Sequence, residues 1–419
     1  MLQIPGDIKM QMGTELLYRI EKYFEINKKE ILEKCYLILF GIFFVDAFLH
    51  TTMFPLKDHS QFHIMLRIVM LVFIFAKIAI SQIYRVSEVF VISIVMLSFF
   101  VAYARRSRYE ILLTFVLLLI GAQGLSFRKI VQVYFGLGAI LMVLMIVAAE
   151  TGLIENLIYH QEGRRARIAF GSVYPTDFSA HVFYLCLAWT YIRKERLRIR
   201  ELIIFFICGS AIYVFCDARM NTVMIILLTL MLLYQKIQRH REIKKGKTRR
   251  RSRLIQGLMV GAVPLCAGLI TLLTLSYRED SEFWKIVNWL TSSRLLLGKK
   301  GITEYGFSWF GQYIPMIGFG GSTETRANYF FLDSSYISIL LCMGTVVFCV
   351  ICFLSVKISY RALKEEDFVF LTILFCMALQ CTVEHHMLEI AYNPFLLSAF
   401  AKSMQNSDGI ILKKEKANE

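Results

Sequence analysis

Long apolar runs recur along most of this 419-residue chain, and they constrain its fold more than any other feature. Because a helix needs about 20 apolar residues to cross a lipid bilayer, runs of about 18 or more predict transmembrane helices. The hydrophobic content of 57% exceeds that of soluble domains and agrees with this prediction. We therefore expect an all-α polytopic membrane protein with about twelve transmembrane helices, near residues 34–50, 64–82, 87–104, 109–126, 131–150, 176–193, 200–216, 220–235, 255–276, 334–356, 367–383 and 386–402.

A basic segment, residues 236–254, sets the expected orientation of these helices. It holds ten Lys or Arg and one Glu, and so carries +9 of the formal net charge of +15. Between two apolar runs, such a segment is typical of a cytoplasmic loop that also contacts anionic lipid headgroups, and we expect no nucleic-acid partner. Residues 1–32 lack the apolar stretch of a signal peptide and are expected to form a cytoplasmic interfacial segment. The membrane domain is then 33–404, with residues 405–419 as a cytoplasmic tail.

The longest polar interruption, residues 277–333, becomes a large extracellular loop in this orientation. Arginines gather in this loop and in other outer segments, although positive charge is disfavoured on that face. Guanidinium groups offer planar, bidentate donors to phosphate or carboxylate, so they predict an anionic ligand. Snorkelling to outer-leaflet phosphates is the alternative, and we favour it for 105–108. The arginines concerned are Arg105, Arg106, Arg108, Arg164, Arg165, Arg167, Arg219, Arg294 and Arg326.

Two carboxylates stand at the ends of apolar runs. Glu384 follows one run and precedes His385 and His386, and Asp333 opens another. Each carboxylate is a candidate general base, or alternatively a structural partner for a nearby arginine. Adjacent histidines point in different directions on a helix, and we find no nucleotide-binding glycine loop, so no metal and no cofactor are expected. An enzyme of this kind would need a donor substrate that arrives already activated.

Several outer segments, taken in order, resemble the Wzy-type polysaccharide polymerases of the O-antigen ligase-like superfamily. The likeness covers about residues 110 to 400, and the family's His-Pro-Asn stands here as Tyr174, Pro175 and Thr176. An inner loop, SFRKIVQVYF at 126–135, fits Gram-positive members. The outer segments are RIAFGSVYPTDFSAH at 167–181, DARMNT at 217–222, SSRLLLGKKGITEYGFSWFGQ at 292–312, LDSSYISILLCMG at 332–344 and EHHMLEIAYNPFLL at 384–397.

The resemblance implies a membrane glycosyltransferase of the bacterial cytoplasmic membrane. Its substrates would be oligosaccharide repeat units on an isoprenoid diphosphate, and the growing glycan would pass to the incoming unit with release of that diphosphate. Arg167, Arg219 and Arg294 are expected to stabilise the leaving diphosphate. Glu384 is the first candidate to accept the proton, with Asp333 and His385 behind it. Further substrate contacts are expected from Arg165, Arg326 and Tyr336. Stacking on sugar faces is expected from Tyr305, Trp309, Tyr313 and Tyr336, with interfacial anchoring as the alternative for Trp309.

Two other functions share part of this pattern. An O-antigen ligase-type transferase has the same fold and motifs but a different acceptor. A polysaccharide-lipid transporter or flippase belongs to another class, and it predicts ionisable residues inside the spans, whereas here the charges gather at the outer edge. As partners we expect membrane lipid, a flippase and a chain-length regulator.

Overall fold

The structure is a computed structural model, and helices dominate it. Helical residues make up 73% of it, in agreement with the expected all-α class. The only strands in the described part of the chain are β1 (Ile158–Tyr159) and β2 (Arg167–Ile168), which pair antiparallel. The structure describes residues 6–55, 60–81, 89–90, 92–94, 96–97, 100–101, 109–160, 165–245, 252–291, 293–324 and 328–402.

The helices differ widely in length, and several predicted spans map onto single helices. The α-helices are α1 (Gly6–Leu49), α2 (Ser60–Ser81), α4 (Tyr109–Gly121), α5 (Phe127–Glu150), α6 (Pro175–Arg193), α7 (Ile199–Cys216), α8 (Arg219–Lys245), α9 (Arg253–Val260), α10 (Ala262–Ser276), α11 (Glu282–Leu290), α12 (Arg294–Tyr305), α13 (Ser335–Ser338), α14 (Gly344–Lys364) and α15 (Phe368–Gln380). The 3-10 helices are η1 (Lys194–Arg196) and η3 (Phe395–Ala399), and a π-helical segment, η2 (Ile339–Met343), joins α13 to α14.

Five helices within the described residues are long and apolar enough to cross a membrane. A sixth candidate arises if α9 and α10, which bend by 69° at their junction, count as one span. The expected number of twelve is therefore not supported, although the class of helical membrane protein is. The five spans are Gln61–Ile80, Phe127–Glu150, Ile199–Cys216, Arg219–Lys244 and Ser335–Lys364.

The last apolar run, residues 386–402, departs from the predicted helix. It forms turns and the short 3-10 helix η3, and most of it is buried. The side-chain amide of Asn393 donates to the Met387 carbonyl at 2.8 Å, and its oxygen accepts from the Phe395 amide at 3.0 Å. Because these bonds satisfy backbone groups without a helix, a buried apolar run need not be helical. The sequence prediction of a span here was wrong for this reason.

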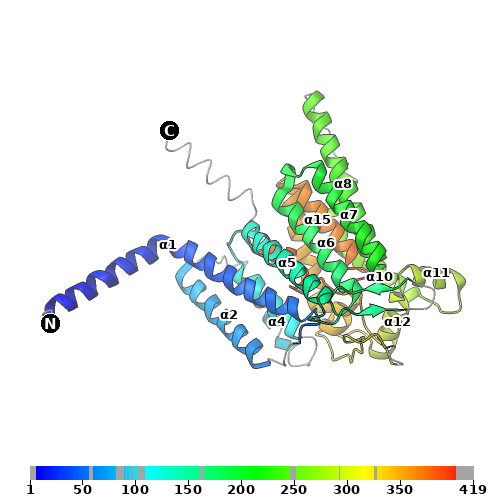
Figure 1. Ribbon diagram of the computed structural model, residues 1–419, viewed down its shortest axis with the longest axis horizontal. Helices are drawn as coiled ribbons and strands as arrows, with labels where there is room; N and C mark the ends of the chain where they lie inside the picture. Colours follow the sequence, from blue (N-terminus) through cyan, green and yellow to red (C-terminus); the bar gives the residue numbers. More distant parts are fainter. Residues whose placement is uncertain are drawn as a thin grey trace.

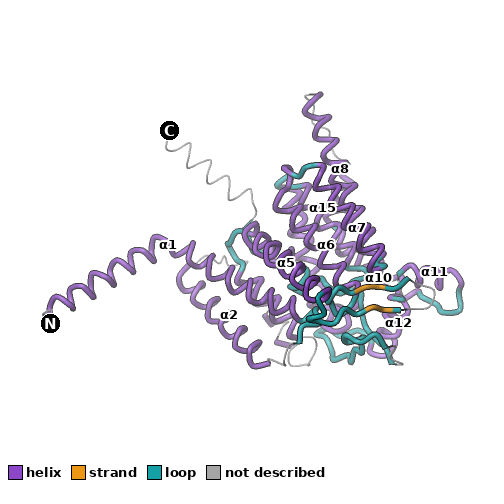
Figure 2. Tube along the Cα trace, viewed as in Figure 1, coloured by secondary structure: helices purple, strands orange, loops and turns teal. Residues whose placement is uncertain are grey.

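The helices pack as an extended layer from which α1 and α8 project. Figure 1 shows the N-terminal part of the 44-residue α1 reaching away from the other helices. Within the described residues, the expected interfacial segment and the expected first span thus share one continuous helix, Gly6–Leu49. Close packing joins α1 to α5, α5 to α6, α7 to α8, and α8 to α15. Loops and the two strands gather at one end of this layer, beside α11 and α12 (Figure 2).

The segment that follows α12 runs against the start of α14. The Gln312 amide donates to the Cys342 carbonyl at 3.1 Å, and the Thr345 amide donates to the Ser308 carbonyl at 3.0 Å. Gly311, with a φ of +81°, lies so close that a Cβ there would stand 2.3 Å from the carbonyl oxygen of Cys342. The approach of these two segments therefore requires glycine at this position.

Replacing Gly311 by alanine is expected to destabilise the protein by about 1–3 kcal/mol, because the methyl group overlaps a carbonyl oxygen and the backbone is left-handed. The measurement is a thermal unfolding curve of the purified protein in detergent. Gly257→Ala in α9 is the matched control, since a Cβ there meets nothing within 4 Å. Equal unfolding temperatures for the two variants would contradict the close approach.

Candidate functional site

Three residues predicted from separate segments meet at the end of the layer where the loops gather. Arg294 opens α12, Asp333 precedes α13, and Glu384 follows α15. The Arg294 Nε atom lies 3.4 Å from the Asp333 Oδ2 atom and donates to the Val383 carbonyl at 3.2 Å. Both charged side chains are largely buried, at 16% and 12% exposed. The arginine thus holds the segment before Glu384 against the start of α13.

The turn that carries Glu384 is fixed by hydrogen bonds to Ser335. The Ser335 hydroxyl donates to the Glu384 carbonyl at 2.6 Å and accepts from the Met387 amide at 3.2 Å. The Ser335 amide donates to the carbonyls of Cys381 and Glu384. One serine therefore sets the path of residues 384–387, and with it the direction of the Glu384 side chain.

His386 lies at the centre of a group of carboxylates. Its ring is fully buried, and its Nδ1 atom lies 3.4 Å from the Glu389 Oε2 atom. Its Nε2 atom faces Glu384 Oε2 at 3.8 Å and Asp177 Oδ1, in the first turn of α6, at 3.9 Å. Carboxylates on both sides favour the charged imidazolium form of this ring. His386 can therefore balance part of the negative charge that these side chains bring together.

Burial and neighbouring charges shift the ionisation of two of these groups. Burial raises the pKa of Glu384, while Arg294 and His386 oppose this effect. Burial lowers the pKa of Arg294, but Asp333 and Glu384 outweigh it, so that this pKa is raised above its ordinary value. A buried carboxylate of raised pKa is a stronger base than an exposed one, and this suits it to accept a proton from a reacting group.

Arg167, in β2, lies beside this cluster and is itself almost fully buried. Its Nε atom donates to the Cys216 carbonyl and its Nη1 atom to the Tyr174 hydroxyl, both at 3.0 Å. The guanidinium carbon also lies 5.0 Å from the centre of the Tyr174 ring. These contacts lock the side chain in one position, so its charge acts from a fixed point on the cluster.

Two other arginines, which are more exposed than Arg167 and Arg294, share one carboxylate in the turn between α7 and α8. Arg165 and Arg219 lie 3.7 Å and 3.6 Å from the same Asp217 Oδ1 atom, and are 51% and 46% exposed. Arg219 also lies over the ring of Trp289, at 5.2 Å. Asp217 has a left-handed backbone with φ of +45°, as does Ser293 before Arg294, with φ of +66°. Such strained residues, placed beside the arginines, are typical of functional sites.

A stack of aromatic rings joins the cluster to the end of α1. The His386 ring stacks on Tyr392 with centroids 3.7 Å apart, and Tyr392 stacks on His181 at 4.2 Å. The His181 Nε2 atom lies 2.8 Å from the Thr51 hydroxyl, just beyond α1. Side chains in contact thus lead from the carboxylates to the connection between α1 and α2.

Other predicted residues lie apart from this centre. Tyr336 is 1% exposed, and its hydroxyl donates to the Ala378 carbonyl at 2.8 Å, so its ring packs in the core rather than facing a sugar. Tyr305 stacks on Phe330, whereas Trp309 and Tyr313 are exposed at 71% and 67%. The arginines that fall outside the described residues are Arg105, Arg106, Arg108, Arg164 and Arg326.

His385 lies at the edge of the cluster, and its position decides whether these side chains could bind a metal ion together. Its Nε2 atom lies 3.6 Å from the Glu389 Oε1 atom. The expectation that adjacent histidines point apart assumed a helix, but this segment is a turn, and the rings of His385 and His386 lie 4.3 Å apart. One ligand atom each from Glu384, His385 and His386 lies within 4.8 Å of the others, which is compatible with a metal ion.

Sequence reasoning missed Asp177, His386 and Glu389 as members of the site. All three stand inside the segments 167–181 and 384–397, which the sequence analysis had singled out, and that position was the available signal. Together with the predicted residues they offer proton acceptors and fixed positive charge at one place. No protein-family model, curated protein or solved structure matches this chain.

Proposed function

We propose that this protein is a membrane glycosyltransferase that polymerises oligosaccharide repeat units carried on isoprenoid diphosphate. The observation that carries the proposal is the convergence of fixed arginines and buried carboxylates beside candidate spanning helices. Arg167 and Arg294 stand with Glu384 and Asp177, although they come from four distant segments. Fixed positive charge next to a proton acceptor suits the displacement of a diphosphate by a hydroxyl group.

In the proposed reaction, the hydroxyl oxygen of an incoming lipid-linked repeat attacks the anomeric carbon of the growing glycan on a second lipid. The bond from that carbon to the phosphate oxygen breaks, and the isoprenoid diphosphate leaves with the electron pair. Glu384 accepts the hydroxyl proton, and His386 and Asp177 lie close enough to pass it on. No nucleotide is needed, because the diphosphate bond already activates the donor.

The exposed pair Arg165 and Arg219 is the proposed binding site for the leaving diphosphate. Two guanidinium groups face the single carboxylate of Asp217, so positive charge is in excess among these three side chains. Arg167 adds a third guanidinium next to the same turn through its bond to the Cys216 carbonyl. Arginine suits this task because its planar donors match phosphate oxygens in pairs.

The length of α8 supports an outward-facing site. This helix begins at Arg219, in the candidate site, and its other end enters the basic segment 236–254. At about 1.5 Å per residue it is roughly 40 Å long, enough to cross the hydrocarbon core of about 30 Å. If the basic end is cytoplasmic, the arginines lie on the outer face of the membrane. Both termini are then proposed to be cytoplasmic.

An apolar groove of about 950 Å³ between α1 and α5 is the proposed seat of an isoprenoid chain. Leu37, Val45 and Leu137 are among its lining residues, and it ends near Leu49, two residues before Thr51. Since α5 is a candidate spanning helix, the groove lies at a depth where lipid chains run. The contacts of Thr51 with His181 connect its end to the proposed catalytic centre.

Replacing Gly136 by phenylalanine is expected to lower polymer formation strongly while the protein stays folded. A Cβ at this groove position meets nothing within 4 Å, so the ring fills the groove instead of clashing. Gly268→Phe in α10 is the control, because a Cβ there is equally unobstructed but lies outside the groove. Polymer length on gels checks the result, and equal lengths for both variants would remove the groove from the proposal.

The direct test is reconstitution of the purified chain in lipid vesicles with a synthetic isoprenoid-diphosphate oligosaccharide. We expect chains of several repeats and release of one isoprenoid diphosphate per bond formed. Transfer of glycan only to a different acceptor would favour a ligase, and movement of the lipid between leaflets without new bonds would favour a flippase. As a simpler probe, farnesyl diphosphate should raise the unfolding temperature of the protein more than farnesol does, because only the former also offers a diphosphate to the arginines.

A further inference from the structure

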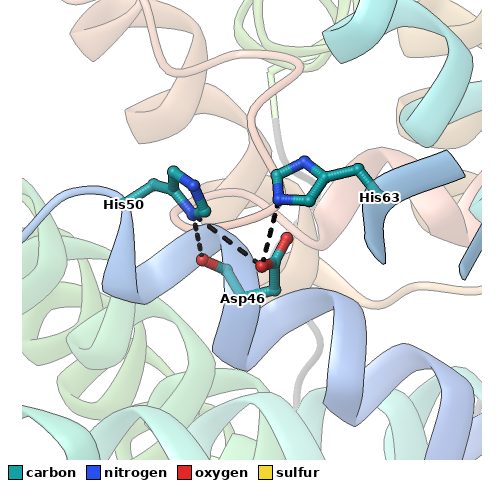
Figure 3. Close-up of side chains that lie close together, drawn as sticks. All are labelled: Asp46, His50 and His63. Atoms are coloured by element: carbon teal, nitrogen blue, oxygen red, sulfur yellow. Dashed lines mark hydrogen bonds and ion pairs between the residues drawn. The ribbon is translucent and has the colours of Figure 1, made fainter. Parts of the chain in front are cut away.

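Two histidines and an aspartate converge at the connection between α1 and α2, away from the carboxylate cluster. Asp46 lies in the last turn of α1, His50 directly follows that helix, and His63 stands in the first turn of α2 (Figure 3). The Asp46 Oδ1 atom lies 3.5 Å from His63 Nε2 and 3.8 Å from His50 Nδ1. The two rings meet edge to face with centroids 5.1 Å apart.

We propose that Asp46, His50 and His63 bind a divalent transition-metal ion, of which Zn²⁺ is the best match. One ligand atom from each residue lies within 4.8 Å of the others. In a tetrahedral zinc site with bonds of about 2.0–2.2 Å, ligand atoms stand roughly 3.3 Å apart, so small side-chain rotations close this site. Two imidazoles and one carboxylate leave a fourth position for water, and this donor set favours zinc over magnesium or calcium.

The present contacts between these side chains are too long to be hydrogen bonds. Distances of 3.5 Å and 3.8 Å exceed the usual range of about 2.7–3.2 Å, although the groups point toward one another. The His63 Nε2 atom is shielded from solvent and makes no hydrogen bond in the described part of the chain. His50 Nδ1 instead contacts the backbone carbonyl of Asp46 at 2.8 Å, a contact that the ring would exchange for the metal ion. A metal ion would satisfy both rings at once.

An ion bound here would fix the segment that follows α1. The Thr51 carbonyl accepts from the Val173 amide at 3.0 Å, and the Met53 amide donates to the Gly171 carbonyl at 2.8 Å. Those bonds hold the strand-to-helix connection that leads into Tyr174 and α6. The metal would therefore support the wall of the candidate site from outside, whatever reaction that site performs.

The test is a titration of the purified, metal-free full chain with Co²⁺, followed by its visible absorption. We expect one equivalent to give the intense bands of a four-coordinate site, Zn²⁺ to remove them, and Mg²⁺ or Ca²⁺ to leave them unchanged. Replacing a residue that only hydrogen-bonds to a metal ligand weakens metal binding about 10- to 100-fold. Replacing a ligand itself, as in His50→Ala and His63→Ala, should weaken Co²⁺ binding at least that much.

Two controls make this result specific. His160→Ala removes an exposed histidine elsewhere, and His385→Ala removes a member of the other possible ligand group; both should keep the Co²⁺ bands. Unfolding temperatures in chelator should be equal for wild type and His63→Ala, which excludes a folding defect. The proposal is overturned if wild type gives no bands, if His50→Ala and His63→Ala bind as tightly as wild type, or if His385→Ala alone abolishes binding.

Discussion

Replacing Arg294 by alanine is expected to abolish polymer formation and to leave only single repeats on lipid. This guanidinium is 16% exposed and lies between Asp333 and the Val383 carbonyl, next to Glu384. Its loss removes the nearest fixed positive charge and leaves buried carboxylates without compensation. Loss of one preorganised donor to a developing anion costs about 10²–10³ in kcat. The initial rate of bond formation in reconstituted vesicles measures the effect.

Two further variants separate catalysis from structure. Arg294→Lys keeps a positive charge but not the planar pair of donors, so it should restore little activity. Arg278→Ala removes an exposed arginine from the same 277–333 segment and should retain the wild-type rate. If Arg294→Ala keeps its unfolding temperature and forms long polymer, the proposed role of Arg294 is wrong. If the Arg294→Ala variant mainly raises KM and leaves kcat unchanged, Arg294 binds the substrate and the transition state equally well.

The sequence predicted which segments build this site, but not how they meet. Asp333 and Glu384 stood out as carboxylates at the ends of apolar runs, and Arg294 as an arginine in the long outer loop. All three come together in the structure. Hydropathy reports how apolar a residue is, not whether its backbone is helical. Residues 386–402 are apolar because protein buries them, and the same pattern would arise from lipid. An apolar run therefore does not by itself show a membrane span, and the expected number of twelve spans is not supported within the described residues.

The sequence also did not predict which side chains contact each other. Arg219 was expected to act like Arg294, yet it is 46% exposed and shares Asp217 with Arg165. Asp177 drew no attention, and His386 was considered only as part of an adjacent histidine pair that was not expected to bind a metal. Their proximity depends on the turn that Ser335 fixes, a contact across about 50 positions of sequence. Such long-range pairs require the folded chain.

Replacing Glu384 by glutamine is expected to remove most of the catalytic activity and to change its pH dependence. The amide has nearly the same shape as the carboxyl group but cannot accept the proton, and general-base catalysis contributes typically about 10²–10⁴-fold. Burial raises the pKa of Glu384, and only the ionised form is a base. Wild-type activity should therefore fall on acidification at a pH above the usual range of exposed carboxyl groups, and this acid limb should vanish in the variant.

A pH profile distinguishes a base from a structural partner of Arg294. If Glu384 only positions Arg294, Glu384→Gln lowers the rate by a constant factor and the acid limb stays. In that case another group must be the base, and Asp177, whose Oδ1 atom lies 3.9 Å from the His386 Nε2 atom, becomes the candidate proton acceptor. Glu279→Gln, at an exposed position, should change neither rate nor profile. The pH profiles of wild type and Glu384→Gln can be compared in this way because Glu384 is only 3% exposed. Its ionisation therefore depends on the same buried charges that would assist the reaction.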